Sequence, residues 1–285
     1  MNALHIRFEE ALLAGDEAEA LRLIDQALEE NLTPVDVMQR VIAPALVAVG
    51  NLWAEGRLNV AQEHLASRLA LRSLEQLRSR SRRRETLGAR AIVACLPGEQ
   101  HEIGARMLAD LLFLDGWDVD FLGANVPAED LVLFVRSRQA RLLALSLSNV
   151  DSEPLLEALL EKVKELPQPP LLALGGAASM GKRWPVQVQS NDLRYAVHRL
   201  RELLEQELEA VEKQSEQDFY QNMGRRLSML RKERGFSQAE LAQAADLDRT
   251  YLSGVERGKQ NPSVGVLLRL SSALGVSLQH ILLPD

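Results

Sequence analysis

The sequence predicts a multidomain protein of α and α/β class, with a four-helix bundle, a doubly wound parallel sheet and a final all-α domain. Three observations support this prediction. Before residue 85, apolar residues recur at helical spacing. From residue 89 to 192, short apolar runs alternate with helical stretches. Glycine and proline then divide residues 216–285 into short helices, and the 285-residue length suits two or three domains.

The composition is that of a globular protein, with 46% hydrophobic and 26% charged residues. Residues 1–10 include charges and no long apolar core, and no stretch approaches the roughly 18–20 apolar residues that a membrane span needs. Cys95 is the only cysteine, which excludes a disulfide framework and a thiolate metal cluster. We therefore expect a cytoplasmic protein that does not contact membranes.

The first domain, residues 1–85, is expected to be the four-helix bundle. A break at residues 15–16 separates the first two helices. Thr33 as N-cap and Pro34 at the first helical position begin a third helix, which ends near residue 56. Asn59 opens a fourth helix, which ends near residue 78. Pro44 lies inside the third helix and is expected to kink it.

The net charge of −7 would repel DNA from the molecule as a whole, so any nucleic-acid contact must come from a local basic face. Residues 78–84 contain five arginines and no acidic residue. We interpret this run as a solvated linker between the bundle and the sheet, rather than as a nucleic-acid patch.

The second domain, residues 89–192, alternates strand and helix. Helices are expected at residues 101–114, 128–138 and 155–165. Predicted strands occupy residues 91–95, 119–122, 142–145 and 171–174, with a weaker fifth at 186–188. The alternation predicts a doubly wound, flavodoxin-like parallel sheet. Ligands bind such sheets at the carboxyl ends of the strands, so a site is expected in the loops after Cys95, Leu145 and Leu174.

Residues 193–215 are expected to form a charged helix that connects the sheet to the last domain, residues 216–285. Asn191 and Asp192 precede it, and apolar residues follow one stripe along it. Two interpretations stay open. The stripe either packs on the sheet, or it extends beyond the sheet as a connector with a dimer seam.

The loop after the first strand contains three residues suited to a metal-bearing ligand: Glu99, His101 and Gly104. A carboxylate two residues before a histidine can accept the proton of one imidazole nitrogen, which leaves the other nitrogen free to bind a metal. Gly104 permits the close approach of a large flat ligand. By itself this cluster is a weak signal.

Two further loops carry small and hydroxyl residues. Ser148 and Val150 follow the third strand, and Gly175 and Gly176 follow the fourth. Small residues at the ends of two adjacent strands would open a slot between them that holds an extended tail.

These three loops resemble the cobalamin-binding domain shared by methionine synthase, corrinoid proteins and the adenosylcobalamin-dependent photoreceptor repressors. That family has an acidic-x-His-x-x-Gly loop, a Ser-x-Leu loop and a Gly-Gly pair in this order. The resemblance implies that His101 is the lower axial cobalt ligand and displaces the nucleotide base. It also implies a pocket for the displaced tail, lined by Ser148, Val150, Gly175 and Gly176. Glu99 stands where Asp is commoner, and Val150 stands in place of Leu.

The helical bundle resembles the cap that covers the upper corrin face in the photoreceptor repressors. Trp53, Glu63 and His64 match that cap in type and spacing. The resemblance implies that Trp53 shields the cobalt–carbon bond, that Glu63 bonds a ribose and that His64 supports it. Ala54 departs from the pattern, because the photoreceptors have there a histidine that captures cobalt after illumination.

The last domain contains Ser-Gln-x-x-Leu-Ala from Ser237, Glu-Arg-Gly ending at Gly258, and a following Asn-Pro pair. Ser237 and Glu240 predict a capping box. Residues 219–285 resemble the phage-repressor type of helix-turn-helix, whose second paired helix enters the major groove of DNA. The domain is nearly neutral, with nine Lys or Arg and eight Asp or Glu in residues 216–285. The expected DNA-contacting residues are Gln238, Arg249, Thr250, Tyr251, Ser253, Arg257 and Lys259.

Together these features predict a cobalamin-dependent transcription regulator that binds double-stranded DNA as a homo-oligomer, a dimer or tetramer, and is not an enzyme. Adenosylcobalamin is the expected cofactor, with methylcobalamin and hydroxocobalamin as alternatives. Light acting on the upper ligand is the leading signal. The alternatives are a light-independent sensor of corrinoid level or type and, with less support, a corrinoid carrier for methyl transfer. The sequence contains no Ser-His-Asp set, phosphate-binding Gly-Lys-Ser/Thr loop or zinc-ligand spacing.

Overall fold

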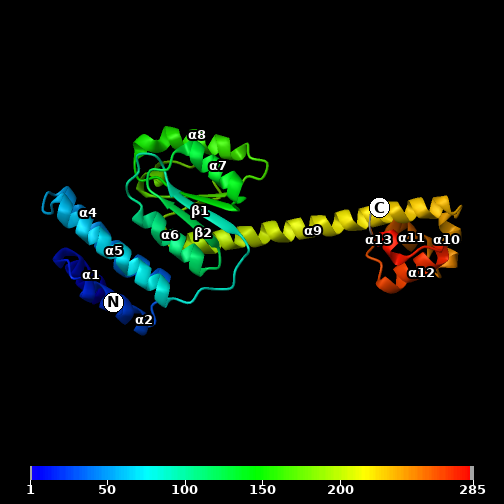
Figure 1. Ribbon diagram of the computed structural model, residues 1–285, viewed down its shortest axis with the longest axis horizontal. Helices are drawn as coiled ribbons and strands as arrows, with labels where there is room; N and C mark the ends of the chain where they lie inside the picture. Colours follow the sequence, from blue (N-terminus) through cyan, green and yellow to red (C-terminus); the bar gives the residue numbers. More distant parts are fainter. Residues whose placement is uncertain (1, 283–285) are drawn as a thin grey trace. The chain divides into compact units, whose positions relative to one another are not determined.

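The computed structural model describes residues 2–282, with the side chains of residues 4–282, and divides into two compact units with the boundary after Glu202 (Figure 1). The first unit contains the helical bundle and the parallel sheet. The second contains the small all-α domain. This organisation confirms the predicted fold class.

The bundle is built around one apolar core that includes Phe8, Leu23, Ile42 and Leu74, all buried. Met107 and Leu111 of the neighbouring α/β domain also enter this core, so the bundle packs directly on helix α6. Its helices are α1 (Asn2–Ala14), α2 (Glu17–Glu29), α3 (Pro34–Val37), the π-helix η1 (Met38–Ile42), α4 (Ala43–Ala54) and α5 (Val60–Arg80).

The expected kink at Pro44 takes the form of a π-helical turn. Helices α3, η1 and α4 follow one another without a break, and the Ala43 N–H donates to the Met38 carbonyl, five residues back. Proline lacks an N–H and its ring crowds the preceding turn, which the wider π-turn relieves. Contrary to the expectation from the sequence, the run Pro34–Ala54 is long and apolar enough, by length and composition alone, to cross a membrane. Met38, Ile42 and other residues of this run are buried in the bundle, as in the core helix of a globular domain.

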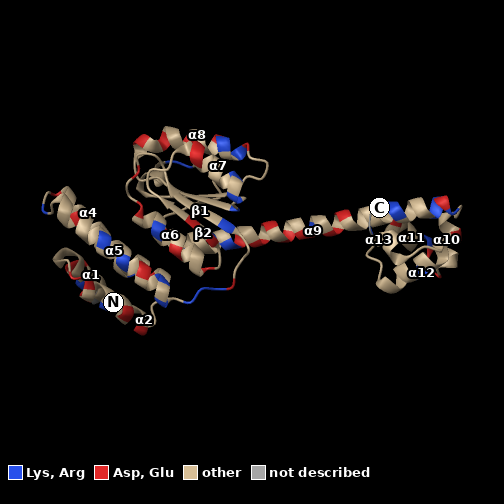
Figure 2. Ribbon diagram, in the orientation of Figure 1, with Lys and Arg blue, Asp and Glu red and all other residues tan. Residues whose placement is uncertain are grey.

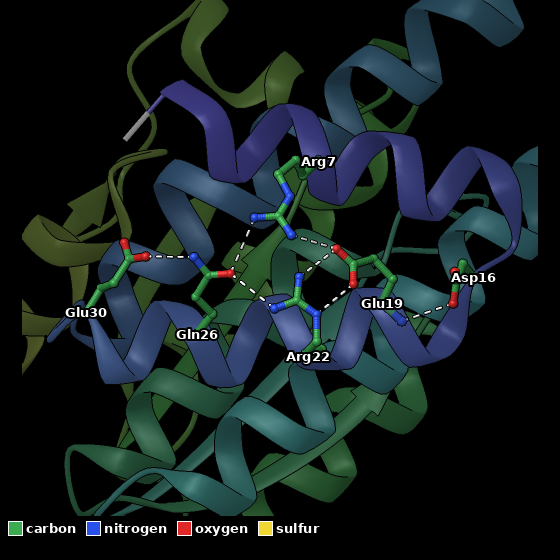
Figure 3. Close-up of polar contacts among 6 residues, drawn as sticks. All are labelled: Arg7, Asp16, Glu19, Arg22, Gln26 and Glu30. Atoms are coloured by element: carbon green, nitrogen blue, oxygen red, sulfur yellow. Dashed lines mark hydrogen bonds and ion pairs between the residues drawn. The ribbon is translucent and has the colours of Figure 1, made fainter.

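Polar contacts attach α1 to α2 (Figure 3). Arg7 donates to Glu19 Oε1 at 2.9 Å and Arg22 donates to Glu19 Oε2 at 2.7 Å. The hydrogen bond from Arg22 is the largest effect on the Glu19 carboxyl and, with Arg7, lowers its pKa to about 2.

The arginine-rich segment is not the freely solvated linker expected from the sequence. Arg78 donates to the buried Asp110 at 3.0 Å, and Arg84 donates to Asp115 at 2.7 Å. Arg83 donates to the carbonyls of Phe113 and Trp117 at 3.1 and 2.9 Å. The linker is attached to α6 because buried acids and helix-end carbonyls there require donors.

The sheet has the order β2-β1-β3-β4-β5 with all strands parallel, as in flavodoxin-like folds. Helices α7 (Ala128–Arg138) and α8 (Glu153–Lys164) share one core with one face of the sheet. Helix α6 (Ile103–Leu114) contacts β1, β2 and β3, between the sheet and the bundle. The strands are β1 (Arg90–Cys95), β2 (Asp118–Gly123), β3 (Leu142–Ser146), β4 (Leu171–Gly175) and β5 (Val188–Gln189). Short 3-10 turns, η2 (Val150–Ser152) and η3 (Ala177–Gly181), follow β3 and β4.

Helix α9 (Leu193–Glu233) is longer than the expected connector of residues 193–215. Residues 208–219 are exposed, and six acidic residues against one lysine lie between 203 and 219, visible as red segments along α9 in Figure 2. Gly224 does not interrupt the helix. A Cβ there would lie 2.3 Å from the Val255 carbonyl oxygen, so this glycine permits close packing on α11.

The second unit packs the end of α9 against four short helices. Its core includes Leu227, Leu241, Leu252 and Leu270, all buried. The helices are α10 (Gln238–Ala244), α11 (Arg249–Glu256), α12 (Val264–Leu274) and α13 (Leu278–Leu282).

Candidate functional site

The loop between β1 and α6 places an exposed histidine on a buried carboxylate. Glu99 is only 1% exposed, whereas the His101 side chain is 84% exposed. Glu99 Oε1 lies 2.7 Å from His101 Nδ1 and also accepts the His101 backbone N–H at 2.8 Å. A proton on Nδ1 is assigned from this contact, and it leaves Nε2 as a free acceptor facing solvent.

The second oxygen of Glu99 accepts the backbone N–H of Ser148 at 2.7 Å. Burial alone would raise the pKa of Glu99, but the hydrogen bonds from His101 and Ser148 outweigh it and lower the pKa. The carboxylate therefore stays ionised, and it fixes both the orientation and the tautomer of the imidazole. Because Ser148 follows β3, this one side chain also joins the first two loops of the site.

The space beside the histidine is open. A Cβ built on Gly104, in the first turn of α6, would meet no atom within 4 Å. The loop itself is held from the β2 side, where Asn125 accepts the Gly98 N–H at 2.9 Å and Glu102 accepts the Ala124 N–H at 3.0 Å. Glu102 and Asn125 were not identified from the sequence, because their contacts depend on the β2 loop lying beside the β1 loop.

The loops after β3 and β4 differ in how they present the other predicted residues. Val150 is 61% exposed, and Ser148 is half-buried. At Gly176 the backbone has φ +100°, and a Cβ would lie 2.4 Å from the Leu147 carbonyl oxygen. Gly176 therefore lets the β4 loop pack on the β3 loop. Gly175 is tight as well, with the Ser190 carbonyl 3.2 Å from its Cβ position.

The predicted cap residues lie where α4 ends and α5 begins. Trp53 is 49% exposed, which is unusual for a bundle tryptophan and leaves one large aromatic surface uncovered. His64 Nδ1 lies 2.8 Å from the Val60 carbonyl and 3.2 Å from Glu63 Oε2, so its Nε2 is free. Ser67 donates to Glu63 Oε1 at 2.6 Å and holds that carboxylate in place. Ser67 was not singled out from the sequence, although its i+4 spacing from Glu63 is a usable signal.

Within residues 2–282, no group of three or more His, Cys, Asp or Glu side chains is placed to hold a metal ion. The loop between β1 and α6 thus offers one imidazole, which suits a metal that arrives with its own ring of donors and takes a single axial ligand from the protein. Two surface hollows, of about 680 and 600 Å³, lie beside α8 and between α2 and α5, and neither is lined by a predicted cofactor residue. The residues present fit a corrin.

The second unit has two well-capped short helices joined by a tight turn. Ser237 and Glu240 form the expected capping box at α10, and Asp248 accepts the Thr250 and Tyr251 N–H groups at the start of α11. The turn passes through Asp246, whose φ is +52°.

A buried ion pair joins the end of α9 to α11. Arg231 Nε lies 2.5 Å from Glu256 Oε1, and Gln238 donates to Glu256 Oε2 at 2.7 Å. Gln238, one of the predicted DNA contacts, is therefore held by α11 through its amide nitrogen, and its amide oxygen is not used in that contact.

The predicted DNA-contacting side chains of α11 are exposed or half-buried. Arg249 and Thr250 are exposed at its first turn, and Tyr251 and Ser253 are half-buried. Arg257 and Lys259 are exposed just beyond its end, and Arg257 Nε donates to the Ser253 carbonyl at 3.1 Å. The second unit therefore offers polar and basic groups at both ends of one exposed helix, as a major-groove reader requires.

Comparison with protein families assigns all three parts. The model of a B12 binding domain matches residues 5–78, and a second B12 binding domain model matches residues 89–199. A helix-turn-helix model matches residues 227–281. The chain is therefore a protein in which B12 binding domains are followed by a helix-turn-helix domain.

Its relatives include transcriptional repressors. The chain is 33% identical over 177 residues to the HTH-type transcriptional repressor CarH of Myxococcus xanthus, a match that covers 60% of this chain and 58% of CarH. It is 35% identical over 122 residues to the repressor CarA of the same organism, covering 42% of this chain and 38% of CarA. The chain thus spans little more than half the length of CarH, and less of CarA.

A solved structure shares the fold of the first unit. The monomethylamine corrinoid protein of Methanosarcina barkeri superposes with a TM-score of 0.60, covering 72% of this chain and 98% of that chain. The sequence identity is 17%, so this likeness shows the fold alone.

Proposed function

We propose that the chain is a cobalamin-dependent transcription regulator, with His101 as the lower axial cobalt ligand. The observation that carries this proposal is the pair of a buried Glu99 and an exposed His101, whose Nδ1 is occupied and whose Nε2 is free. A histidine held in this way by a carboxylate is oriented and made more basic as a metal ligand. The repressor relatives and the helix-turn-helix domain support a regulatory role over an enzymatic one.

Each remaining site residue has a defined task in this proposal. Gly104 leaves room for the corrin beside His101, while Ser148, Val150, Gly175 and Gly176 border the slot for the displaced nucleotide tail. Trp53 covers the upper face, and Glu63 bonds the upper group with support from Ser67 and His64. Bound adenosylcobalamin, the proposed form, would supply a cobalt–carbon bond that light or ligand exchange can break. Methylcobalamin and hydroxocobalamin are the alternative forms.

Light is the proposed signal, because Trp53, Glu63 and His64 match the cap of the photoreceptor repressors. One observation favours a second function, a light-independent sensor of corrinoid level or type. Ala54 occupies the position at which the photoreceptors carry a cobalt-capturing histidine, so the same capture cannot occur there.

The proposed output is binding of double-stranded DNA in the cytoplasm. Arg249, Thr250, Tyr251 and Ser253 would contact base edges, whereas Arg257 and Lys259 would contact phosphates. Gln238 would contact the backbone or a base through its free amide oxygen. Since residues 216–285 are nearly neutral, a single domain would bind DNA weakly, and we propose that a dimer or tetramer occupies the operator.

The test is an absorption spectrum of the adenosylcobalamin-loaded protein, taken before and after green light and repeated with His101→Ala. We expect the wild type to bind cobalamin with its lower base displaced. His101→Ala is expected to bind more weakly and to retain the spectrum of the free cofactor. Light also breaks the cobalt–carbon bond of free adenosylcobalamin, so the light signal is tested by DNA affinity. A change in DNA affinity on illumination supports it, and an unchanged affinity favours the light-independent sensor. Equal affinity and equal spectra for wild type and His101→Ala would contradict the axial-ligand assignment.

A further inference from the structure

The start of helix α9 is attached to the helical bundle. Arg194 Nη2 donates to Asp36 Oδ1 in α3 at 2.8 Å, and Gln39 Nε2 in η1 donates to Asp192 Oδ1 at 3.1 Å. The same oxygen of Asp192 accepts the backbone N–H groups of Arg194 and Tyr195 at 2.9 and 3.1 Å. The residue that caps α9 is therefore also bonded to the bundle.

Two turns later, α9 is attached to the C-terminal end of α6. Arg201 Nε donates to Asp115 Oδ2 at 2.9 Å, and Arg201 also donates to the Asp115 carbonyl. The other carboxylate oxygen accepts from Arg84 of the linker at 2.7 Å. Asp115 is 7% exposed, so it depends on these donors in a setting where an ion pair is weakly screened.

Apolar contacts reinforce both attachments. Leu193 and Val197 pack against the bundle core beside Met107 and Leu111 of α6. Helix α6 in turn begins two residues after His101 and ends immediately before Asp115. The first part of α9 thus touches the bundle, which carries the proposed upper-face residues, and the helix that follows the proposed cobalt ligand.

We propose that the first three turns of α9 change their contacts when the bundle moves relative to the sheet. Asp36 and Asp192 provide the contacts with the bundle, and Asp115 provides those with the α/β domain. This inference rests on the proposed function, in which cobalamin lies between bundle and sheet. Residues 192–194 are bonded to the bundle, whereas Arg201 is bonded to Asp115 at the end of α6 in the α/β domain. A shift of the bundle therefore changes the contacts at residues 192–194 more than those at Arg201. Helix α9 continues to Glu233, so the altered segment belongs to the helix that supplies the core residue Leu227 to the DNA-binding unit.

The test is amide hydrogen exchange in residues 203–219 of the full chain, with and without adenosylcobalamin. In the wild type, loading is expected to change the exchange rate by at least about fivefold, the lower range of allosteric coupling. The double variant Gln39→Ala, Arg194→Ala removes the bundle-side bonds from surface positions. We expect it to bind cobalamin with the wild-type spectrum while its exchange ratio falls towards one.

Arg199→Ala is the matched control, because Arg199 pairs with Glu202 of the same helix at 3.0 Å. It should keep the wild-type exchange ratio. An equal ratio in the double variant and the wild type would overturn the inference, as would a wild type that binds cobalamin without any change in exchange. A wild type that binds no cobalamin would overturn the proposed function and this inference with it.

Discussion

At the scale of single residues, the proposed site depends on Glu99 more than on any other side chain. It is buried, it holds the imidazole of His101, and it accepts the Ser148 N–H from the neighbouring loop. One carboxylate thus determines both the direction of His101 and the spacing of two loops. Its position two residues before the histidine predicts the contact with His101. Its hydrogen bond from Ser148 could not be predicted in this way, because it depends on β1 and β3 being neighbours in the sheet.

Glu99→Gln tests this dependence. The amide can still accept one hydrogen bond, but it no longer carries the negative charge that faces Nδ1 of His101 at 2.7 Å. We expect cobalamin affinity to fall by about 10- to 100-fold, the usual effect of changing such a partner. Titration followed by absorption measures this. Glu153→Gln, a change at the first turn of α8, serves as the control, and equal affinity of Glu99→Gln and wild type would contradict the role given to Glu99.

Two glycines of the site should respond oppositely to alanine. Gly176→Ala places a Cβ 2.4 Å from the Leu147 carbonyl oxygen at φ +100°, so we expect a loss of about 1–3 kcal/mol or more in the free energy of unfolding. Gly104→Ala adds a methyl group to open space in a helix, so stability should be kept or rise by up to about 1 kcal/mol. Cobalamin affinity of Gly104→Ala should nevertheless fall. Chemical denaturation and cofactor titration measure the pair, and a stable Gly176→Ala or a tightly binding Gly104→Ala would contradict the two roles.

At the scale of elements, the strands and most helices followed from local pattern. The continuous apolar runs of β1, β3 and β4 predict buried parallel strands, and their bounds agree within a residue. The features that local sequence patterns did not predict depend on contacts between residues that are distant in the sequence. The pairing of Arg78 with Asp110 turned an expected free linker into an attached one. The connector helix expected at residues 193–215 continues to Glu233, and its Gly224 lies where α11 approaches too closely for a Cβ.

The caps of the second unit predict its acid sensitivity. Hydrogen bonds from the Tyr251 and Thr250 N–H groups lower the pKa of Asp248 below its unfolded value of about 3.9. Its contribution to stability is therefore complete above the unfolded pKa and is lost as pH falls through the lower folded pKa. The protection factors of the α11 amides, which are corrected for the intrinsic exchange rate at each pH, should decrease in that window. Asp248→Asn keeps a capping oxygen that does not titrate, so it should lose less protection on acidification, and equal acid sensitivity would contradict the assignment.

At the scale of the whole molecule, B12 binding domains and a helix-turn-helix domain share one chain, and helix α9 belongs to both compact units. The net charge of −7 and the acidic stretch of α9 disfavour DNA binding away from the basic groups near α11. Affinity should therefore depend strongly on oligomerisation and salt. The cobalamin-binding part and the helix-turn-helix part could both be predicted from the sequence, because each contains several motifs at defined spacing. The ion pairs of Asp36 and Asp115 that attach α9 could not, because their partners are distant in the sequence.

Arg249→Ala tests whether α11 is the recognition helix. Arg249 is exposed at its first turn, where a base-contacting side chain would project into the groove. We expect a loss of about 1–3 kcal/mol in binding to a DNA site selected by the wild-type chain from random-sequence DNA, with relaxed sequence preference. Lys232→Ala, an exposed charge change at the end of α9, is the control. If the two variants bind that DNA equally well, α11 is not the reader.

The most direct test of the central claim is the DNA affinity of the full chain in its apo form and loaded with adenosylcobalamin, in darkness and after green light, at one fixed salt concentration. We predict that loading changes the affinity by at least about fivefold and that, if light is the signal, illumination reverses much of this change. A light-independent sensor would show the first difference without the second. Superimposable binding curves for apo and loaded protein in both conditions would contradict the claim that cobalamin controls DNA binding by this chain.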